Sequence, residues 1–456
     1  WTTRTGHLWH LALICSEKRM QVYSKKQLNL SFMRKFLFLI SLIACMASCG
    51  NDDLESVEAV IPNQAQQLSF KISPEEAKIE LSNFMNQFNS SNTRTRSVEE
   101  MQIADVCPIR NGVHTRAAAS NMSDSYDVDI DTLLYAINFA DNQGFALVAA
   151  DKRTSPILAI IDEGSFSIDS LNENKDEGFL MFVDYAIKME IQDIENYKEP
   201  SQTRSLKTNG YTINSEYTPI LHTKWTQSGV YGKYCPNGTA GCVIIATAQI
   251  LSHYKTIGHV NWSYNGTMGS SDLHWDKIMS DCDKNNGVLT SSSCATSANE
   301  VAHLVRYLGI ALGAEYKKSN ETSAKTSKAV EWFNKWGGLN ASSLKGYNES
   351  NIISAIKSGY PVLGRGNSGK KKVLGIRVGW KGGHAWVYDG VLVASKDGKS
   401  NNFVHCNWGW GGYKNGYYIS KAFDTNAGAP IYDSSDEQSG KTPNYKYNLE
   451  YSIVKK

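Results

Sequence analysis

The hydrophobic pattern of the first half of the chain predicts a small unit of two helices and a sheet. Residues 68–90 predict the first helix, because Ser73-Pro74-Glu75-Glu76 offers a capping residue, a proline suited to the first turn and two acids that favour the positive end of the helix dipole. Residues 91–127 are rich in Ser, Thr, Asn and Arg and predict a loop. A strand hairpin, a third strand and a closing helix are predicted at 133–139, 144–150, 157–161 and 174–197.

The second half changes from helical to strand patterns. Residues 242–251 are apolar on nearly every side, which is typical of a buried central helix. Two more helices are predicted near 297–312 and 323–336. After Pro361, short alternating runs predict antiparallel strands at 373–378, 385–393, 403–407 and 416–420. Helices followed by antiparallel strands indicate an α+β fold.

A polar linker, residues 198–211, separates the two halves. It contains Arg204 and Lys207, which we expect to be open to proteases because such a segment cannot bury its backbone well.

The N-terminus carries the pattern of an export signal. We interpret residues 1–32 as an upstream extension that is not native to the protein. Met33-Arg34-Lys35 and the apolar run 36–44 resemble the basic and apolar regions of a signal peptide, and the run is too short for a permanent membrane helix. Met46-Ala47-Ser48-Cys49 resembles a bacterial lipobox, which implies cleavage before Cys49 and lipid attachment to its sulfur. A signal peptide that is simply removed explains the apolar run as well.

Composition and charge narrow the function classes. The 456 residues suffice for two or three domains, and residues 1–48 hold seven of the 47 Lys and Arg residues but one of the 45 acids. The remainder therefore has a formal charge of −4, which gives no electrostatic reason to expect nucleic-acid binding. Nine cysteines are too few for a disulfide scaffold. Export would still permit a bridge, and Cys282 and Cys294 are the candidate pair.

Two residues of the second half suit nucleophilic chemistry. Cys242 opens the apolar helix, where free backbone N–H groups and the helix dipole stabilise a thiolate. His384 follows Gly382 and Gly383, which let backbone and substrate approach closely, and the strand-like run after it would fix the imidazole. Its role would be to take the thiol proton and later to protonate a leaving amine. Taken singly, a cysteine beside an apolar run is more commonly a buried structural residue, and most histidines of the chain are explained as core residues.

A third segment, Asn407-Trp408-Gly409-Trp410-Gly411-Gly412, could orient the histidine. An amide oxygen can accept the imidazole N–H, and an indole can shield that bond from water. The plain structural interpretation is a turn rich in glycine and aromatic residues. His405 competes with His384, but the paired glycines before His384 suit an open cleft better.

Two other chemistries are disfavoured. A zinc site built from Cys235, Cys242, His384 and Cys406 has poor spacing, since six residues instead of two to four lie between the first two cysteines. Residues 364–371 nearly spell a phosphate-binding loop, yet they lack the Ser or Thr after the lysine and the following helix. We therefore expect no cofactor and no metal.

With these motifs the chain resembles the streptopain family of papain-like peptidases. A cysteine, a histidine about 140 residues later and then an Asn-containing segment is the order expected of papain-like enzymes. The matching segments of the second half are 224–227, 233–237, 241–243, 246–250, 361–363, 382–385 and 407–412. In the first half, residues 144–151 resemble the inhibitory prodomain of the family.

The resemblance implies roles for single residues. Cys242 would be the nucleophile and His384 the base, and the orienting position falls on Asn407 or Trp408, with Asn407 favoured on chemistry. Gly382, Gly383 and Trp410 would contact substrate.

The oxyanion hole departs from the papain pattern. Papain-like enzymes commonly place a glutamine six residues before the nucleophile, where this chain has Pro236. Gln227 is the nearest upstream glutamine that could replace it, and the backbone N–H of Cys242 can supply one donor regardless.

The resemblance thus implies an exported cysteine endopeptidase made as a zymogen, which favours an apolar side chain at the second position before the cut. A two-lobed papain-like domain would follow an α+β prodomain. The implied division is an upstream extension, a signal peptide, a tether, the prodomain and the peptidase, at 1–32, 33–48, 49–66, 67–204 and 205–456. The expected partners are protein or peptide substrates, the chain's own prodomain and a lipid anchor at the outer membrane or cell surface; the alternative is secretion. Two other functions stay open: a non-catalytic binding or adhesin module on this fold, and an amide hydrolase acting on cell-wall peptides.

Overall fold

A computed structural model describes residues 70–91, 102–110, 132–168, 177–198, 210–368, 382–424 and 449–456, all within one compact unit, Ser69–Lys456. The predicted signal peptide, the predicted lipid-attachment residue Cys49, the predicted tether, most of the linker and the predicted strand at 373–378 lie outside the described residues. Below, "N-terminal part" means the described residues up to 198, and "C-terminal part" means those from 210 onward.

The N-terminal part contains the predicted helices and hairpin. Its elements are α2 (Pro74–Ser91), β1 (Ile103–Arg110), β2 (Thr132–Phe139), η1 (Ala140–Asn142), β3 (Phe145–Ala149), β4 (Ile157–Ile161) and α4 (Glu177–Glu195). The start of α2 is a capping box, because the Ser73 hydroxyl accepts from the Glu76 amide at 3.2 Å while the Glu76 carboxylate accepts from the Ser73 amide at 2.8 Å. The loop predicted over 91–127 is wrong where β1 lies. The proline of β1, Pro108, is tolerated because β1 is an edge strand that pairs with β2 alone among the described strands.

The C-terminal part has a mainly helical first half and a mainly stranded second half, as predicted, but it opens with a strand at Thr212–Tyr217 that the pattern did not predict. Its helices are α5 (Cys242–Tyr254), α6 (Trp275–Lys284), α7 (Ala295–Ala311), α8 (Thr326–Lys335), α9 (Glu349–Lys357) and η3 (Ser420–Phe423). Its long strands are β5 (Thr212–Tyr217), β6 (His259–Tyr264), β7 (Thr267–Asp272), β12 (Val362–Ser368), β13 (Gly382–Lys396), β14 (Lys399–Asn407), β15 (Gly416–Ile419) and β16 (Glu450–Lys455). Four two-residue strands, β8 (Glu315–Tyr316), β9 (Thr322–Ser323), β10 (Asn340–Ala341) and β11 (Lys345–Gly346), complete it. Cys282 and Cys294 are both free, so the candidate disulfide is not formed.

One antiparallel sheet runs through both parts. Among the described strands its order is β1-β2-β3-β4-β15-β14-β13-β12-β16-β10, with β5 added on β13 and β11 on β16. The junction is the pairing of β4 with β15, in which Ile161 lies opposite Gly416. A Cβ at Gly416 would come within 2.3 Å of the Ile160 carbonyl oxygen, so this close approach requires glycine. The two halves separated by the sequence pattern are therefore joined through backbone hydrogen bonds.

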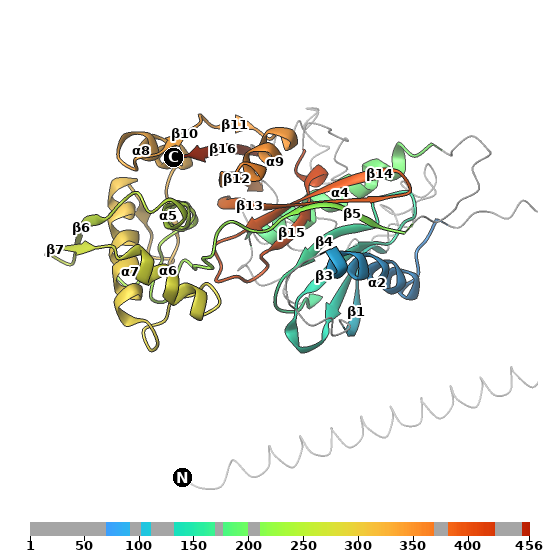
Figure 1. Ribbon diagram of the computed structural model, residues 1–456, viewed down its shortest axis with the longest axis horizontal. Helices are drawn as coiled ribbons and strands as arrows, with labels where there is room; N and C mark the ends of the chain where they lie inside the picture. The colour runs from blue at the N-terminus through green and yellow to red at the C-terminus, as the bar shows by residue number, and fades with distance from the viewer. Residues whose placement is uncertain are drawn as a thin grey trace, which may run out of the picture. The chain divides into compact units, whose positions relative to one another are not determined.

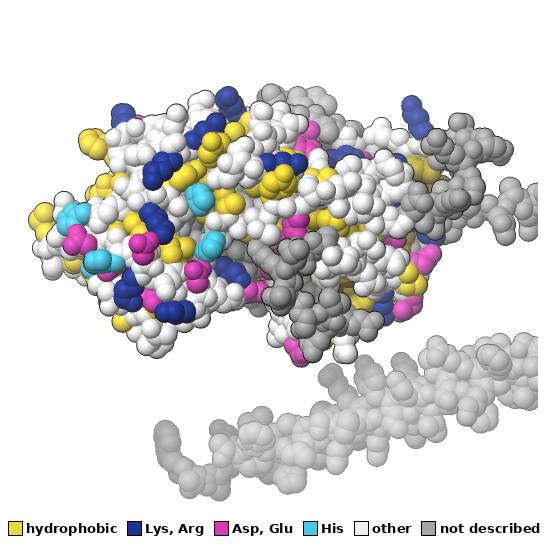
Figure 2. Space-filling view, viewed as in Figure 1, with side chains coloured by type: hydrophobic (Ala, Val, Ile, Leu, Met, Phe, Trp, Pro, Cys, Tyr) yellow, Lys and Arg dark blue, Asp and Glu magenta, His cyan; other side chains and the backbone are white. Residues whose placement is uncertain are grey.

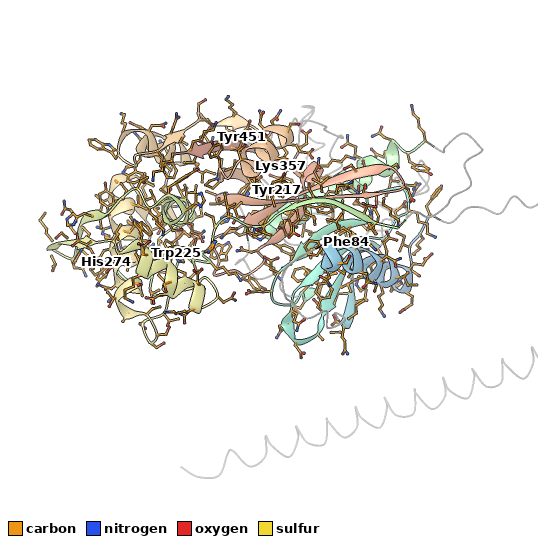
Figure 3. The ribbon with its side chains drawn as sticks, in the orientation of Figure 1. Phe84, Tyr217, Trp225, His274, Lys357 and Tyr451 are labelled. Carbon is orange, nitrogen blue, oxygen red and sulfur yellow. The ribbon has the colours of Figure 1, made fainter. Side chains whose placement is uncertain are left out.

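Two hydrophobic clusters accompany this sheet. One lies between α5, α7 and α8 in the helical lobe, and the other unites the N-terminal part with β13, β14 and β15 (Figure 1). In the second cluster, Phe84 of α2, labelled in Figure 3, lies in the N-terminal part. Its ring packs edge-on against Tyr211 and contacts Phe403 of β14. Among the described residues no helix combines the length and apolar character needed to cross a membrane. Over the described residues on the face in Figure 2, basic and acidic side chains are interspersed.

A buried carboxyl group makes the stability of the N-terminal part depend on pH. Glu190 of α4 is fully buried, and its Oε2 accepts a hydrogen bond from the Thr154 hydroxyl at 2.6 Å. Burial raises the pKa of Glu190 well above its usual range, and the neighbouring Asp193 and Asp151 act in the same direction. The folded protein therefore holds a proton on Glu190 that the unfolded chain releases.

We expect Glu190→Gln to flatten part of this pH dependence. Above the unfolded pKa of about 4.3 the folded state binds more protons than the unfolded state, so the free energy of unfolding falls as the pH rises. Between pH 4 and pH 8 the Tm of the wild-type precursor should fall by several degrees relative to that of the variant. Thermal unfolding of both proteins, with Glu75→Gln on the exposed side of α2 as control, measures this difference. Parallel Tm curves for wild type and Glu190→Gln would contradict it.

Candidate active site

Cys242 is the first residue of the central helix α5. It is half-buried and follows Gly241, whose φ of 92° lies in the region that favours glycine. A Cβ at Gly241 would lie 3.0 Å from the carbonyl oxygen of Thr322. No side chain caps the N-terminus of α5, so the amides of its first turn are placed where a thiolate or an oxyanion could accept hydrogen bonds.

His384 lies on β13, which packs against α5. Its Nε2 is 3.0 Å from the main-chain carbonyl oxygen of Trp408. A carbonyl oxygen only accepts, so Nε2 must donate, and in the neutral ring the lone pair then resides on Nδ1. The ring is stacked against Trp386 at 6.2 Å and against Trp410 at 5.9 Å, with interplanar angles of 11° and 8°. The imidazole is therefore fixed in both orientation and tautomer.

Asn407 does not orient His384 in this structure. Its Oδ1 accepts from Gln249 Nε2 at 3.1 Å and from the Gly409 amide at 3.3 Å, and its Nδ2 donates to the Thr223 carbonyl oxygen at 2.7 Å. The amide is thus fully used in tying the end of β14 to α5 and to the segment before Trp225. The contact that we expected from the Asn407 side chain is made instead by the main chain of Trp408, the second candidate.

Gln249 is a site-supporting residue that the sequence reasoning missed. It lies on α5, fully buried, and its Oε1 accepts from the amide of Trp225 at 3.0 Å. Figure 3 shows Trp225 in the helical lobe. The signal was a glutamine within an otherwise apolar helix, because a buried amide needs hydrogen-bond partners.

A short pairing between two loops connects Trp410, which stacks on His384, with the segment that carries Gln227. Thr226 forms an antiparallel bridge with Trp410, and the Gly411 amide donates to the Trp225 carbonyl oxygen at 3.2 Å. Gln227 is largely buried, and its own carbonyl oxygen accepts from the amide of Ala240, two residues before Cys242. Gly383, next to His384, is exposed.

The competing histidine, His405, is in a different environment. Its Nδ1 lies 2.6 Å from a carboxylate oxygen of the fully buried Asp389, and its Nε2 lies 3.0 Å from Asp162 of the N-terminal part. Burial alone would lower the pKa of His405, but the two carboxylates outweigh it and raise that pKa to about 10. A group that stays protonated at neutral pH cannot accept a thiol proton, which favours His384 as the base.

Helix α4 of the N-terminal part covers the indole ring of Trp408, which forms an aromatic wall beside His384. A Cβ on Gly178 would lie 2.1 Å from Cε3 of Trp408, so the helix backbone rests directly on that indole. Further along α4, Phe182 contacts the ring of Tyr418 at 4.6 Å. This surface is therefore closed to other molecules while α4 is in place.

Charge pairs between the two parts all have the same polarity. In each described pair the acid belongs to the N-terminal part and the base to the C-terminal part: Glu80 with Lys396, Asp162 with His405, Glu163 with Lys224, and Asp193 with Lys421. Such complementarity is typical of two surfaces that recognise one another.

Two family profiles match the chain in the order of these two parts. The Spi protease inhibitor profile matches residues 69–186, and the Peptidase C10 family profile matches residues 225–418. The second range includes Cys242, His384 and Asn407.

Curated relatives cover both parts as well. Streptopain from Streptococcus pyogenes serotype M28 is 26% identical over 327 residues, which cover 64% of this chain and 75% of the relative. The thiol protease/hemagglutinin PrtT from Porphyromonas gingivalis is 23% identical over 349 residues, covering 67% of this chain and 36% of the relative. Among solved structures, a fragment of prointerpain A from Prevotella intermedia aligns with a TM-score of 0.46 and 21% identity, over 71% of this chain and 94% of that one.

Proposed function

Because this chain belongs to the streptopain family of cysteine peptidases (Peptidase C10), with a Spi-type inhibitory prodomain before the peptidase domain, we propose that Cys242 and His384 are its catalytic pair. The family, the α+β fold with a papain-like domain, and the endopeptidase activity of a zymogen were all inferred from the sequence and are confirmed. The roles of single residues, the domain bounds 67–204 and 205–456, and export are part of the proposal.

The observation that carries the proposal is the tautomer of His384. With Nε2 donating to the Trp408 carbonyl oxygen, the basic nitrogen is Nδ1. In the active enzyme Nδ1 takes the proton of the Cys242 thiol, and the thiolate attacks the peptide carbonyl carbon. The imidazolium then donates this proton to the leaving amine, and water, activated by the same nitrogen, hydrolyses the thioester.

The remaining residues position this chemistry. The first-turn amides of α5 and the side chain of Gln227 would stabilise the oxyanion. Gly382 and Gly383 would let the substrate backbone approach His384, and Trp410 would form an apolar wall for it. Asn407 acts as a brace between β14 and α5 and is a positioning residue in this proposal.

Activation requires that the N-terminal part leave. We expect trypsin to trim a Cys242→Ala precursor within about residues 204–211, a window that is largely outside the described residues, while the untreated variant persists at full length if processing is by the enzyme itself. Trimmed wild type should then react with an epoxysuccinyl probe at Cys242, whereas full-length protein should react far more slowly.

Gel electrophoresis, N-terminal sequencing and mass spectrometry of the labelled peptide provide the readouts. If the active form begins inside residues 128–195, or if the uncut precursor is fully active, the inhibitory role is wrong. If trimmed protein is not labelled faster than a free thiol near neutral pH, the non-catalytic adhesin interpretation gains support.

Export with a lipid at Cys49 is proposed from residues 33–49, which read as a lipoprotein signal. Metabolic labelling with a radioactive fatty acid, compared between wild type and Cys49→Ser, tests it; equal labelling would exclude lipid attachment at this residue.

A further inference from the structure

A short segment of the prodomain, Asp162–Phe166, lies across loops next to the catalytic site. The Glu163 carboxylate accepts hydrogen bonds from Lys224 Nζ and, at 2.9 Å, from Asn286 Nδ2. The carbonyl oxygen of Ser165 accepts from Lys414 Nζ at 3.3 Å. The segment therefore neutralises or solvates two cations that belong to the peptidase domain.

Lys414 is buried and has a backbone conformation that is unfavourable for a lysine. Its side chain is 1% exposed, and its φ of 61° lies in the left-handed region. Its Nζ lies 4.4 Å from the ring centroid of Phe145 and 5.0 Å from that of Phe179. These rings belong to the prodomain, so its departure uncovers this ammonium group. An unfavourable backbone conformation at a buried cation suggests a functional reason for keeping lysine here.

Both lysines are close to the catalytic groups along the chain. Lys224 precedes the Thr226–Trp410 bridge by two residues, and Lys414 follows Trp410 by four. A Cβ at Gly412 would lie 2.8 Å from Cδ of Lys224, so the Lys224 stem packs on the same turn that carries Lys414. The Trp410 ring is stacked on His384. The two lysines thus belong to the loops that hold Trp410 against His384.

The identity of the leaving group determines which part of a substrate lies on the His384 side of the site. His384 must protonate the leaving amine, so the residues that follow the scissile bond lie over His384 and the Trp410 turn. An acidic side chain there would meet the loops that carry both lysines.

We propose that Lys224 and Lys414 form a subsite that selects acidic side chains after the scissile bond, and that Glu163 occupies its place in the precursor. The inference rests on the peptidase function proposed above. Exposed charge pairs contribute modestly and are screened by salt, so we expect about a five-fold preference in kcat/KM at low ionic strength and less at high salt.

The test compares matched fluorogenic peptides that are cleaved by trimmed enzyme after trypsin has been inhibited. The peptides share an apolar residue at the second position before the cut and carry Glu or Gln at the second to fourth positions after it. In Lys224→Gln with Lys414→Gln the Glu-to-Gln ratio should fall from about five to about one. Lys335→Gln, an exposed lysine of α8, should keep the wild-type ratio.

A charge-reversal variant distinguishes loss of the subsite from misfolding of the double variant. Lys224→Glu should favour a peptide with Lys at these positions, which a loss of folding would not produce. Equal cleavage of the Glu and Gln peptides by wild type, or an unchanged ratio in the double variant, overturns the subsite and leaves the peptidase function intact. Wild type that cleaves neither peptide better than Cys242→Ala overturns both.

Discussion

Replacing Cys242 by alanine in the trimmed enzyme is expected to lower kcat/KM by about 100,000-fold, to the level of residual background hydrolysis. His384→Ala should cost nearly as much, because a thiol without a base at Nδ1 is a poor nucleophile at neutral pH. The double variant should be hardly worse than either single variant, since the two side chains act as one unit. Initial rates on a peptide with an apolar residue two positions before the cut measure these losses.

The control is His222→Ala, which removes an exposed imidazole that pairs with Asp283. It should keep kcat/KM within about two-fold of wild type. If Cys242→Ala retains a substantial fraction of the wild-type rate, the nucleophile is a different residue. If the losses in the single variants multiply in the double variant, Cys242 and His384 act independently and the thiol–imidazole pair is wrong.

Local signals explain why Cys242 and His384 could be proposed as the catalytic pair from the sequence. The apolar run that starts at Cys242 and the strand that starts near His384 each carry their own periodicity, and the glycines beside them mark tight backbone approaches. The orienting contact was assigned first to the Asn407 side chain, with Trp408 as second candidate, for the opposite reason. It is made by a main-chain oxygen of Trp408, which every residue type possesses, so the identity of a side chain could not reveal it.

The pairing between the two halves of the chain could not be predicted from the sequence either. Pairing of β4 with β15 depends on backbone hydrogen bonds between segments some 250 residues apart, and no side-chain pattern specifies that register. Helix α6 was overlooked although its buried Trp275, Ile278 and Cys282 fall at helical spacing, because the polar residues between them resemble a loop. The contacts of Asp162 and Glu163 with the peptidase domain likewise depend on tertiary packing alone.

A substitution in the prodomain should release the peptidase domain without changing any residue of that domain. Gly178→Leu places a side chain where even a Cβ would lie 2.1 Å from the Trp408 ring, so α4 must move away from the aromatic wall. Overpacking of this kind typically costs about 1–3 kcal/mol, which would weaken prodomain docking by roughly five- to 150-fold. We expect full-length Gly178→Leu to react with the epoxysuccinyl probe before any trimming, at a rate at least about five-fold above that of full-length wild type.

A matched control separates release from general destabilisation. Gly258→Leu makes the same exchange in the peptidase domain at a position where an added Cβ meets nothing within 4 Å, and it should leave the precursor as unreactive as wild type. Gly178→Ala should have a smaller effect than Gly178→Leu, since a methyl group displaces α4 less. Labelling of the full-length band on a gel distinguishes precursor from trimmed enzyme. The contrary result would be full-length Gly178→Leu that stays as unreactive as wild type while its trimmed form is labelled normally. In that case the contact of α4 with Trp408 does not keep the precursor inactive, and the prodomain must block the site through another contact.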